Sequence, residues 1–231
     1  MLAYVVRHAE SLSNVDPAAG LNSGLSTLGE RQAEALAERL RAVPLRAIYC
    51  SPFARCIATA RALTAGRDLP IRVRPDLCEH HHLSTEAKVD HGLEAMEDLA
   101  RQHGDVVACP DYPAPFVWVP TDESRADLVA RIRCLAAYLK ERWTGEDDAI
   151  VVLGHGSPIA RLIEAWIIDQ PGPSFRFMID NCAINALRFC EGVSSLVCLN
   201  EVSHLHGLAA PSQANYTDDG QIKPRSPSSY W

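Results

Sequence analysis

An arginine and a histidine stand side by side at the end of an apolar run near the start of the chain. The run covers residues 2–6, and Arg7 and His8 follow it directly. A buried strand that ends in such a pair delivers a cation and a nucleophile or base to the edge of a sheet. The pair therefore predicts a reactive site at a strand end, if other elements bring partners to it.

Three further predicted strands are each followed by a side chain that can do chemistry, and these are Arg55, Glu79 and His155. Ligands of open α/β sheets bind beyond the carboxyl ends of the strands, so these residues and the first pair should meet at one rim. Arg55 also lies in the first turn of a predicted helix, whose N–H groups attract anions. Two guanidinium forks beside a helix N-terminus suit a tetrahedral oxyanion, most often phosphate. The sequence predicts a phosphate pocket with a nucleophile in it.

The elements that must position these residues alternate along the chain. Strands are predicted at residues 2–6, 47–50, 71–73, 149–153, 183–189 and 195–199, the last two as a hairpin at the sheet edge. Helices are predicted at about 27–43, 51–65, 85–102, 123–143 and 157–168, with Thr27 and Glu30 as a capping box and Ser51 and Ser157 as N-caps. This order predicts a three-layer α/β/α sandwich with a mostly parallel central sheet and one antiparallel edge strand.

Two parts of the chain depart from this alternation. An insertion at about 80–120 begins with His80, His81 and His82, and its section 105–120 has four prolines and no basic residue, which predicts an irregular insertion or lid. The histidines are expected to form a solvated loop or pocket-rim contacts rather than a metal site. The C-terminal tail, 207–231, is polar and is expected to be disordered or docked on the body or on a neighbouring chain, which makes a homodimer a candidate assembly. Residues 1–206 form the predicted catalytic domain.

Composition excludes several classes of function. The net charge is −7 with scattered basic residues, which argues against a nucleic-acid or anionic-membrane partner. No apolar run approaches the roughly 18 residues of a membrane span, and the N-terminus has no signal-peptide pattern, so a cytoplasmic location is expected. The eight cysteines include no C-x-x-C pair and are expected to be reduced thiols. We expect no metal and no other cofactor.

The first segment, Val6-Arg7-His8-Ala9-Glu10-Ser11 with Asn14, resembles the R-H-G-E-S-x-x-N signature of the histidine phosphatase superfamily, the phosphoglycerate-mutase-like proteins. Further segments resemble the family in the expected order, and these are Leu25-Ser26-x-Leu28-Gly29 with Gln32-Ala33, Tyr49-Cys50-Ser51-Pro52-x-x-Arg55 with Thr59-Ala60, Glu123-Ser124 with Arg131, and Val152-Leu153-Gly154-His155-Gly156. Ala9 stands where glycine is commonest, and three histidines follow Glu79 in place of a glycine-containing stretch.

The resemblance implies a role for each matched residue. His8 would attack phosphorus to form a phosphohistidine, and Glu79 would protonate the leaving oxygen and later activate water. The groups around the phosphate oxygens would be Arg7, Arg55 and His155, with Asn14 touching the phosphate or orienting His8, and Ser23 and Gly24 lining the pocket. Asp76 and Glu86 compete with Glu79 for the acid role.

Hydrolysis of a small phosphorylated substrate, a phosphomonoester, is the reaction that we predict. A phosphoglycerate-type phosphomutase must hold a second anionic group, yet residues 76–120 offer only Lys88 and Arg101 as cations. That alternative is therefore less favoured. A phosphate-binding scaffold protein with low activity is the alternative from another class, because the motif after Glu79 is unusual.

Overall fold

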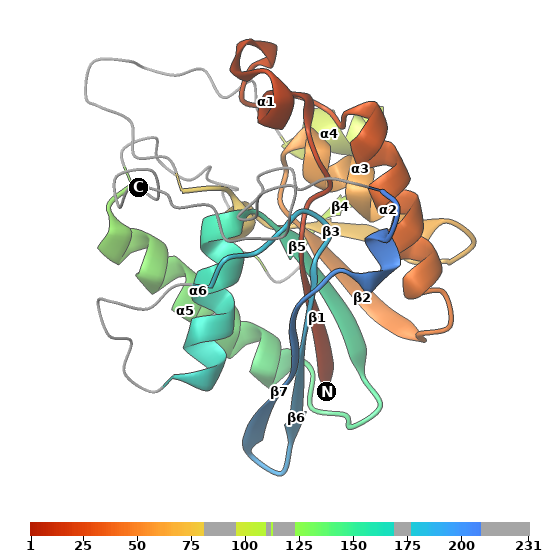
Figure 1. Ribbon diagram of the computed structural model, residues 1–231. Helices are drawn as coiled ribbons and strands as arrows, with labels where there is room; N and C mark the ends of the chain where they lie inside the picture. Colours follow the sequence, from red (N-terminus) through yellow and green to blue (C-terminus); the bar gives the residue numbers. More distant parts are fainter. Residues whose placement is uncertain (81–95, 110–111, 113–122, 169–176, 209–231) are drawn as a thin grey trace.

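The computed structural model describes residues 1–80, 96–109, 112, 123–168 and 177–208 (Figure 1). Its strands are β1 (Leu2–Arg7), β2 (Leu45–Cys50), β3 (Ile71–Val73), β4 (Val106–Ala108), β5 (Ala149–Gly154), β6 (Ile184–Cys190) and β7 (Val193–Glu201). Its α-helices are α1 (Leu12–Val15), α2 (Thr27–Arg39), α3 (Ala54–Thr64), α4 (Met96–Gln102), α5 (Arg125–Arg142) and α6 (Gly156–Ile167). Short 3₁₀ turns are η1 (Pro17–Ala19), η2 (Pro75–Leu77) and η3 (Ser203–Leu205).

The seven strands form one sheet in the order β4-β3-β2-β5-β1-β6-β7. The pairs from β4 through β1 are all parallel, whereas β6 runs antiparallel to β1 and β7 antiparallel to β6. The predicted sandwich with a mostly parallel sheet is confirmed. The strand that runs antiparallel to the others is β6, the first strand of the predicted hairpin. It lies one place from the edge, because β7 forms the edge of the sheet.

Helices cover both faces of the sheet and bury alternate residues of each strand. In Figure 1, α2, α3 and α4 lie on one face, while α5 and α6 lie on the other. Along β5, Val151 and Leu153 pack into the core under α2 and α3, whereas Ile150 and Val152 pack under α5 and α6. All six residues of β5 are buried, as expected for a central parallel strand covered on both sides. The residue that follows β5, His155, therefore begins at the centre of the sheet.

The predicted N-caps of three helices were wrong by one or two residues. The N-cap of α2 is Ser26 rather than Thr27, because the Ser26 side chain accepts a hydrogen bond from the Gly29 N–H. Neither Ser51 nor Ser157 caps a helix: α3 begins at Ala54, and the N-cap of α6 is His155. The Ser51 hydroxyl instead lies 2.8 Å from His155 Nε2, so the residue expected to cap a helix contributes to the site.

The section 105–120 is not irregular throughout. Val106–Ala108 forms β4, which pairs in parallel with β3 and covers its outer side. Arg61 of α3 reinforces this edge through two hydrogen bonds to the Asp105 carboxylate. The described part of the predicted helix at 85–102 is α4. The rest of that helix, most of the insertion, and the tail from residue 209 lie outside the described residues.

No helix in the described part of the chain is both long and apolar enough to cross a membrane.

Candidate active site

The end of β1 places His8 in the interior at the carboxyl edge of the sheet. The His8 N–H donates to the Gly154 carbonyl at the end of β5, and the Cys182 N–H donates to the Arg7 carbonyl from the other side. The side chain is almost completely buried. Neighbouring backbone thus fixes the position of His8 on both sides of β1.

The hydrogen bonds of the His8 ring determine which nitrogen can act as a nucleophile. Nδ1 lies 2.7 Å from the Ala9 carbonyl, which can only accept, so Nδ1 carries the proton. Arg55 Nε donates to His8 Nε2 over 3.2 Å, so Nε2 presents a lone pair. Burial, followed by the positive charges of Arg55 and Arg7, lowers the pKa of His8 well below its ordinary value of 6.5. The ring is therefore neutral near pH 7, with Nε2 as its nucleophilic atom.

Arg55 joins the two imidazoles of the site. Its Nη2 lies 3.2 Å from His155 Nδ1, and its Nη1 donates to the Leu21 carbonyl. Because an arginine can only donate, His155 Nδ1 accepts and Nε2 carries the hydrogen, which points to the Ser51 hydroxyl. The rings of His8 and His155 are 5.0 Å apart between centroids. The predicted meeting of the residues after β1, β2 and β5 is thus present in the structure.

Cys56 also reaches this group, with its Sγ 3.5 Å from His155 Nε2. Burial raises the pKa of the Cys56 thiol to about 12. The thiol therefore stays protonated near pH 7 and does not compete with His8 as a nucleophile.

Arg7 holds a hydrogen-bond donor ready for a ligand. Its Nη1 donates to the Ile179 carbonyl at 2.8 Å, while its Nε is buried without a partner among the described residues. A buried donor of a cation that lacks a partner is costly, and an anionic oxygen would satisfy it.

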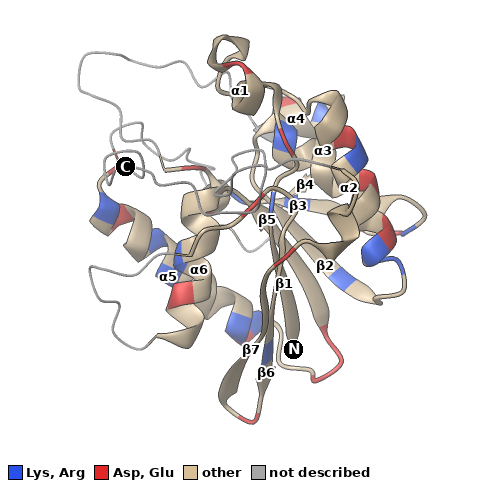
Figure 2. Ribbon diagram, viewed as in Figure 1, with Lys and Arg blue, Asp and Glu red and all other residues tan. Residues whose placement is uncertain are grey.

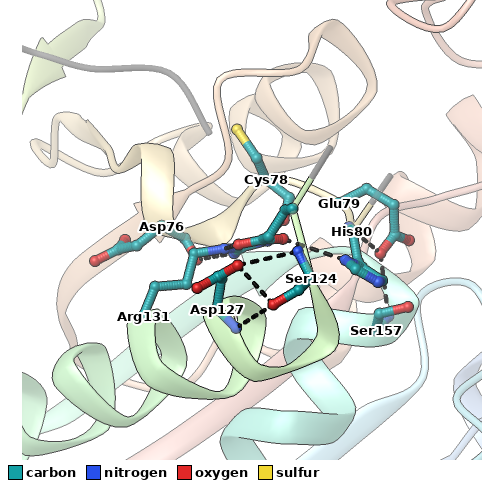
Figure 3. Close-up of polar contacts among 9 residues, drawn as sticks. Asp76, Cys78, Glu79, His80, Ser124, Asp127, Arg131 and Ser157 are labelled. Carbon is teal, nitrogen blue, oxygen red and sulfur yellow. Dashed lines mark hydrogen bonds and ion pairs between the residues drawn. The ribbon is translucent and has the colours of Figure 1, made fainter. Parts of the chain in front are cut away.

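Glu79 and Arg7 both lie close to Gly156, the first residue of α6. A Cβ placed on Gly156 would lie 4.0 Å from both Arg7 Nε and Glu79 Oε2, so the two side chains border the same small space. Glu79 Oε1 accepts from the N–H of His80 at 2.8 Å and from that of Ser157 at 3.3 Å (Figure 3). These bonds turn Oε2 toward Gly156.

The competitors of Glu79 are placed differently. Asp76 is buried and forms a bidentate pair with Arg74, with 2.6 Å between Asp76 Oδ2 and Arg74 Nη2, so its carboxylate is already neutralised. Glu86 lies outside the described residues. Of the two candidate acids that the structure describes, Asp76 and Glu79, it is Glu79 that borders the Arg7 donor.

Asn14 lies in α1, whereas Ser23 and Gly24 lie between η1 and α2. Asn14 Oδ1 accepts from the Ser11 N–H and lies 3.4 Å from Asn181 Nδ2, which itself donates to the His8 carbonyl. The Ser23 hydroxyl accepts from the Ser13 N–H, and the Gly24 carbonyl accepts from the Leu12 N–H. Asn14 thus reaches His8 through Asn181, while Ser23 and Gly24 shape the loop.

The matched residues of α2 hold the segment after His8 in place. The Gln32 side chain accepts from the Glu10 N–H, the Ser26 hydroxyl donates to the Glu10 carboxylate, and the Ser26 N–H donates to the Glu10 carbonyl. A Cβ on Gly29 would lie 1.9 Å from that carbonyl oxygen, so only glycine allows this close approach. The N-terminus of α2 therefore packs directly on the chain that carries His8.

Sequence reasoning missed several residues that build the site. Ser51 and Asn181 hold His155 and His8 as described above, and Asn22 accepts from the Ala54 N–H at the start of α3. The contacts of these three residues depend on loop conformation, which hydrophobic periodicity does not report.

The described residues contain no group of three or more metal-ligating side chains arranged to hold an ion. His80 contacts Glu123, with 3.3 Å between Nδ1 and Oε2, while His81 and His82 lie outside the described residues.

An α/β sandwich with two imidazoles and two arginines at the carboxyl ends of its central strands defines a phosphate-handling protein. The sequence profile described as Histidine phosphatase superfamily (branch 1) matches residues 3–202, and the chain belongs to that superfamily. It is a histidine phosphatase of the phosphoric monoester hydrolase class.

Relatives that are named for different substrates align with most of this chain. An adenosylcobalamin/alpha-ribazole phosphatase of Salmonella typhimurium is 29% identical over 87% of this chain and 96% of its own. Phosphoserine phosphatase 1 of Hydrogenobacter thermophilus is 26% identical over 87% of this chain and 92% of its own. The structure of a mycobacterial glucosyl-3-phosphoglycerate phosphatase with VO3 superposes with a TM-score of 0.62 and 25% identity, covering 87% of this chain and 99% of that one.

Proposed function

We propose that the protein hydrolyses phosphomonoesters through a phosphohistidine formed on Nε2 of His8. The observation that carries the proposal is the lone pair of His8 Nε2 in a buried, neutral ring between two arginines. Arg7 Nε, which is buried and unpartnered among the described residues, supplies a donor for a phosphate oxygen. Relatives named as phosphatases of different phosphate esters align with this chain, which supports phosphomonoester hydrolysis by this protein.

In the first step, Arg55 Nε shifts its hydrogen bond from His8 Nε2 to a phosphate oxygen, Nε2 attacks phosphorus, and the bond from phosphorus to the leaving oxygen breaks. Arg7, Arg55 and His155 stabilise the charge on the equatorial oxygens, where the transition state concentrates it. His155 turns from Ser51 toward the phosphate to donate its Nε2 hydrogen. Glu79 Oε2 transfers a proton to the leaving oxygen, so the product leaves as a neutral alcohol.

In the second step, water attacks the phosphohistidine from the side that the alcohol has left. Glu79, now ionised, takes a proton from that water while the bond between phosphorus and Nε2 breaks. Inorganic phosphate departs and His8 returns to its neutral form. Asn14 acts through Asn181 on the His8 backbone, and Ser23 and Gly24 hold the start of α1 by accepting hydrogen bonds from Ser13 and Leu12.

The substrate that we propose is a small phosphorylated alcohol. Basic and acidic residues are interspersed along α2 and α5 (Figure 2), a pattern that favours a small ligand over nucleic acid. The phosphomutase alternative lacks support from Arg101, whose side chain is exposed and paired with Asp98 on α4. Lys88 lies outside the described residues.

We also propose the domain bounds, the cellular location and the oligomeric state of the enzyme. Residues 1–206 are assigned to the catalytic domain and 207–231 to a tail, which is supported by the family match over 3–202. A cytoplasmic location is supported by eight unpaired cysteines, five of them buried. A homodimer is supported by exposed apolar side chains on β7, namely Val193, Leu196, Val197 and Leu199, and light scattering of the full chain tests it.

A phosphoenzyme trap with a His8→Ala variant tests the mechanism. The wild-type protein should turn over p-nitrophenyl phosphate and, when quenched during turnover, carry a phosphoryl group that acid removes and base does not. His8→Ala should lose about 1,000-fold or more in kcat and carry no phosphoryl group. A wild-type protein that binds vanadate without turnover would support the scaffold alternative, and a fully active His8→Ala would refute the phosphohistidine.

A further inference from the structure

A buried ion pair lies next to the segment that carries Glu79. Glu123 and Arg131 face one another across the start of α5, with Arg131 Nε and Nη2 donating to the two oxygens of the Glu123 carboxylate. Only 3% of the Glu123 side chain and 14% of the Arg131 side chain are exposed. A bidentate pair at this depth is rigid, and its desolvation is expensive unless further hydrogen bonds satisfy it.

The remaining donors of Arg131 go to the backbone beside Glu79. Its Nη1 donates to the Asp76 carbonyl at 2.6 Å and its Nη2 to the Cys78 carbonyl at 3.0 Å (Figure 3). One guanidinium therefore holds two carbonyls of the turn that leads from β3 into Glu79. The Ser124 and Asp127 capping box fixes the start of α5 next to Glu123.

The residue after Glu79 is held by the other member of the pair. His80 Nδ1 lies 3.3 Å from Glu123 Oε2, and the His80 N–H donates to Glu79 Oε1. Both sequence neighbours of Glu79 are thus fixed by the same ion pair: Cys78 through its carbonyl and His80 through its ring. Glu79 contacts neither Glu123 nor Arg131 in the described hydrogen bonds, so the pair acts on it through the backbone.

We infer that Glu123 and Arg131 are positioning residues for Glu79, which keep its carboxyl aimed at the leaving oxygen. This inference rests on the proposed role of Glu79 as proton donor. General-acid catalysis depends on geometry, and a displacement of about 1 Å can cost on the order of 100-fold. The pair therefore matters most for substrates whose leaving oxygen needs a proton.

The test compares two substrates of similar shape, p-nitrophenyl phosphate and phenyl phosphate. The phenyl ester has the poorer leaving group and depends more on Glu79. Arg131→Lys keeps the charge but loses the fork that spans Glu123 and the two carbonyls. It should lower kcat/KM about 10-fold more for phenyl phosphate than for p-nitrophenyl phosphate. Arg133→Lys, on the exposed side of the same helix, is the control and should leave both values unchanged.

Two features keep the result interpretable. The ratio of the two kcat/KM values is independent of the folded fraction of a preparation, so a destabilised variant still gives an answer. Glu123→Gln, which keeps the side-chain shape and removes the charge, provides a second variant that should change the ratio in the same direction.

Glu79→Gln separates the inference from the proposed function. If Glu79→Gln lowers kcat/KM equally for both esters, Glu79 is not the acid and that part of the proposed function fails. If Glu79→Gln discriminates between the esters while Arg131→Lys and Glu123→Gln affect both equally, the proposed function stands and the positioning role is overturned.

Discussion

Arg7, His8, Arg55 and His155 lie at or just after the ends of the central strands β1, β2 and β5. Glu79 instead follows β3, a strand of three residues that lies one place from the edge of the sheet. Backbone bonds between neighbouring strands hold the His8 side, for example from the His8 N–H to Gly154 and from the Ser51 N–H to Leu153. Side-chain bonds from α5 hold the Glu79 side. In the proposed mechanism, the half of the site that binds the phosphoryl group is thus part of the sheet, and the half that contacts the leaving group is held to the sheet by side chains.

This difference predicts two kinds of variant. Every substrate of the enzyme presents the same phosphoryl group, so damage on the His8 side should lower activity on all of them alike. Leaving groups differ, so damage on the Glu79 side should change the ranking of substrates. The experiments below test this division.

Among the variants that compare the two halves, Arg55→Lys should have the largest effect. A lysine keeps one positive charge but cannot contact His8, His155 and the Leu21 carbonyl together, as Arg55 does. We expect a loss of about 100-fold or more in kcat/KM, equal for p-nitrophenyl phosphate and phenyl phosphate. Steady-state kinetics with both esters measures it.

Arg61→Lys is the matched control for that measurement. Arg61 lies on the same helix, but pairs with Asp105 at a site where both side chains are more than one-third exposed. Its replacement should leave both kcat/KM values nearly unchanged. A loss in Arg55→Lys that is much larger for one ester than for the other would contradict the division between the two halves.

Gly29→Ala should act on the His8 side through packing. In an ordinary helix this change is stabilising by roughly 1 kcal/mol. Here the new Cβ would meet the Glu10 carbonyl oxygen at 1.9 Å, and that oxygen is backbone next to the catalytic segment. We expect a net destabilisation of about 2 kcal/mol, together with an equal loss of activity on both esters. Denaturant unfolding measures the stability change.

Gly104→Ala is the comparison for this substitution, because open space surrounds the position of its Cβ. It should change the free energy of unfolding by less than about 0.5 kcal/mol. Equal stability of Gly29→Ala and the wild-type protein would mean that the start of α2 moves away from Glu10 at little cost.

The same two halves differ in how far the sequence predicts them. Apolar runs of four to six residues identify β1, β2 and β5, and strand ends in a parallel sheet must meet, so the grouping of Arg7, His8, Arg55 and His155 follows from pattern and topology. Ser51 shows the limit of local rules: serine before proline is a common N-cap, yet its hydroxyl bonds to His155, which is 104 residues away in the chain.

The surroundings of Glu79 were harder to predict for a physical reason. Its position depends on side-chain bonds between segments far apart in the chain, such as Arg131 to the Cys78 carbonyl. No periodicity encodes such a bond. β4 was missed because its apolar run is only three residues long and four prolines follow it before residue 121, a composition that predicts a loop.

A buried neutral histidine on the His8 side should make stability depend on pH in a known direction. Burial and the two arginines lower the pKa of His8 in the folded protein, whereas the unfolded chain binds that proton at about pH 6.5. Between these two pKa values the unfolded state binds more protons, so stability rises with pH. The contribution is lost as the pH falls below about 6.5, at up to about 1.4 kcal/mol for each pH unit.

His8→Asn removes this titration. From about pH 7 to about pH 5, the wild-type protein should lose up to about 2 kcal/mol more unfolding free energy than the variant. His204, whose pKa burial also lowers, is present in both proteins and cancels from the difference. Denaturant unfolding in phosphate-free buffer gives the two curves. If they run parallel through this range, His8 binds a proton as readily in the folded chain as in the unfolded one, and the neutral nucleophile of the phosphoryl half must be abandoned.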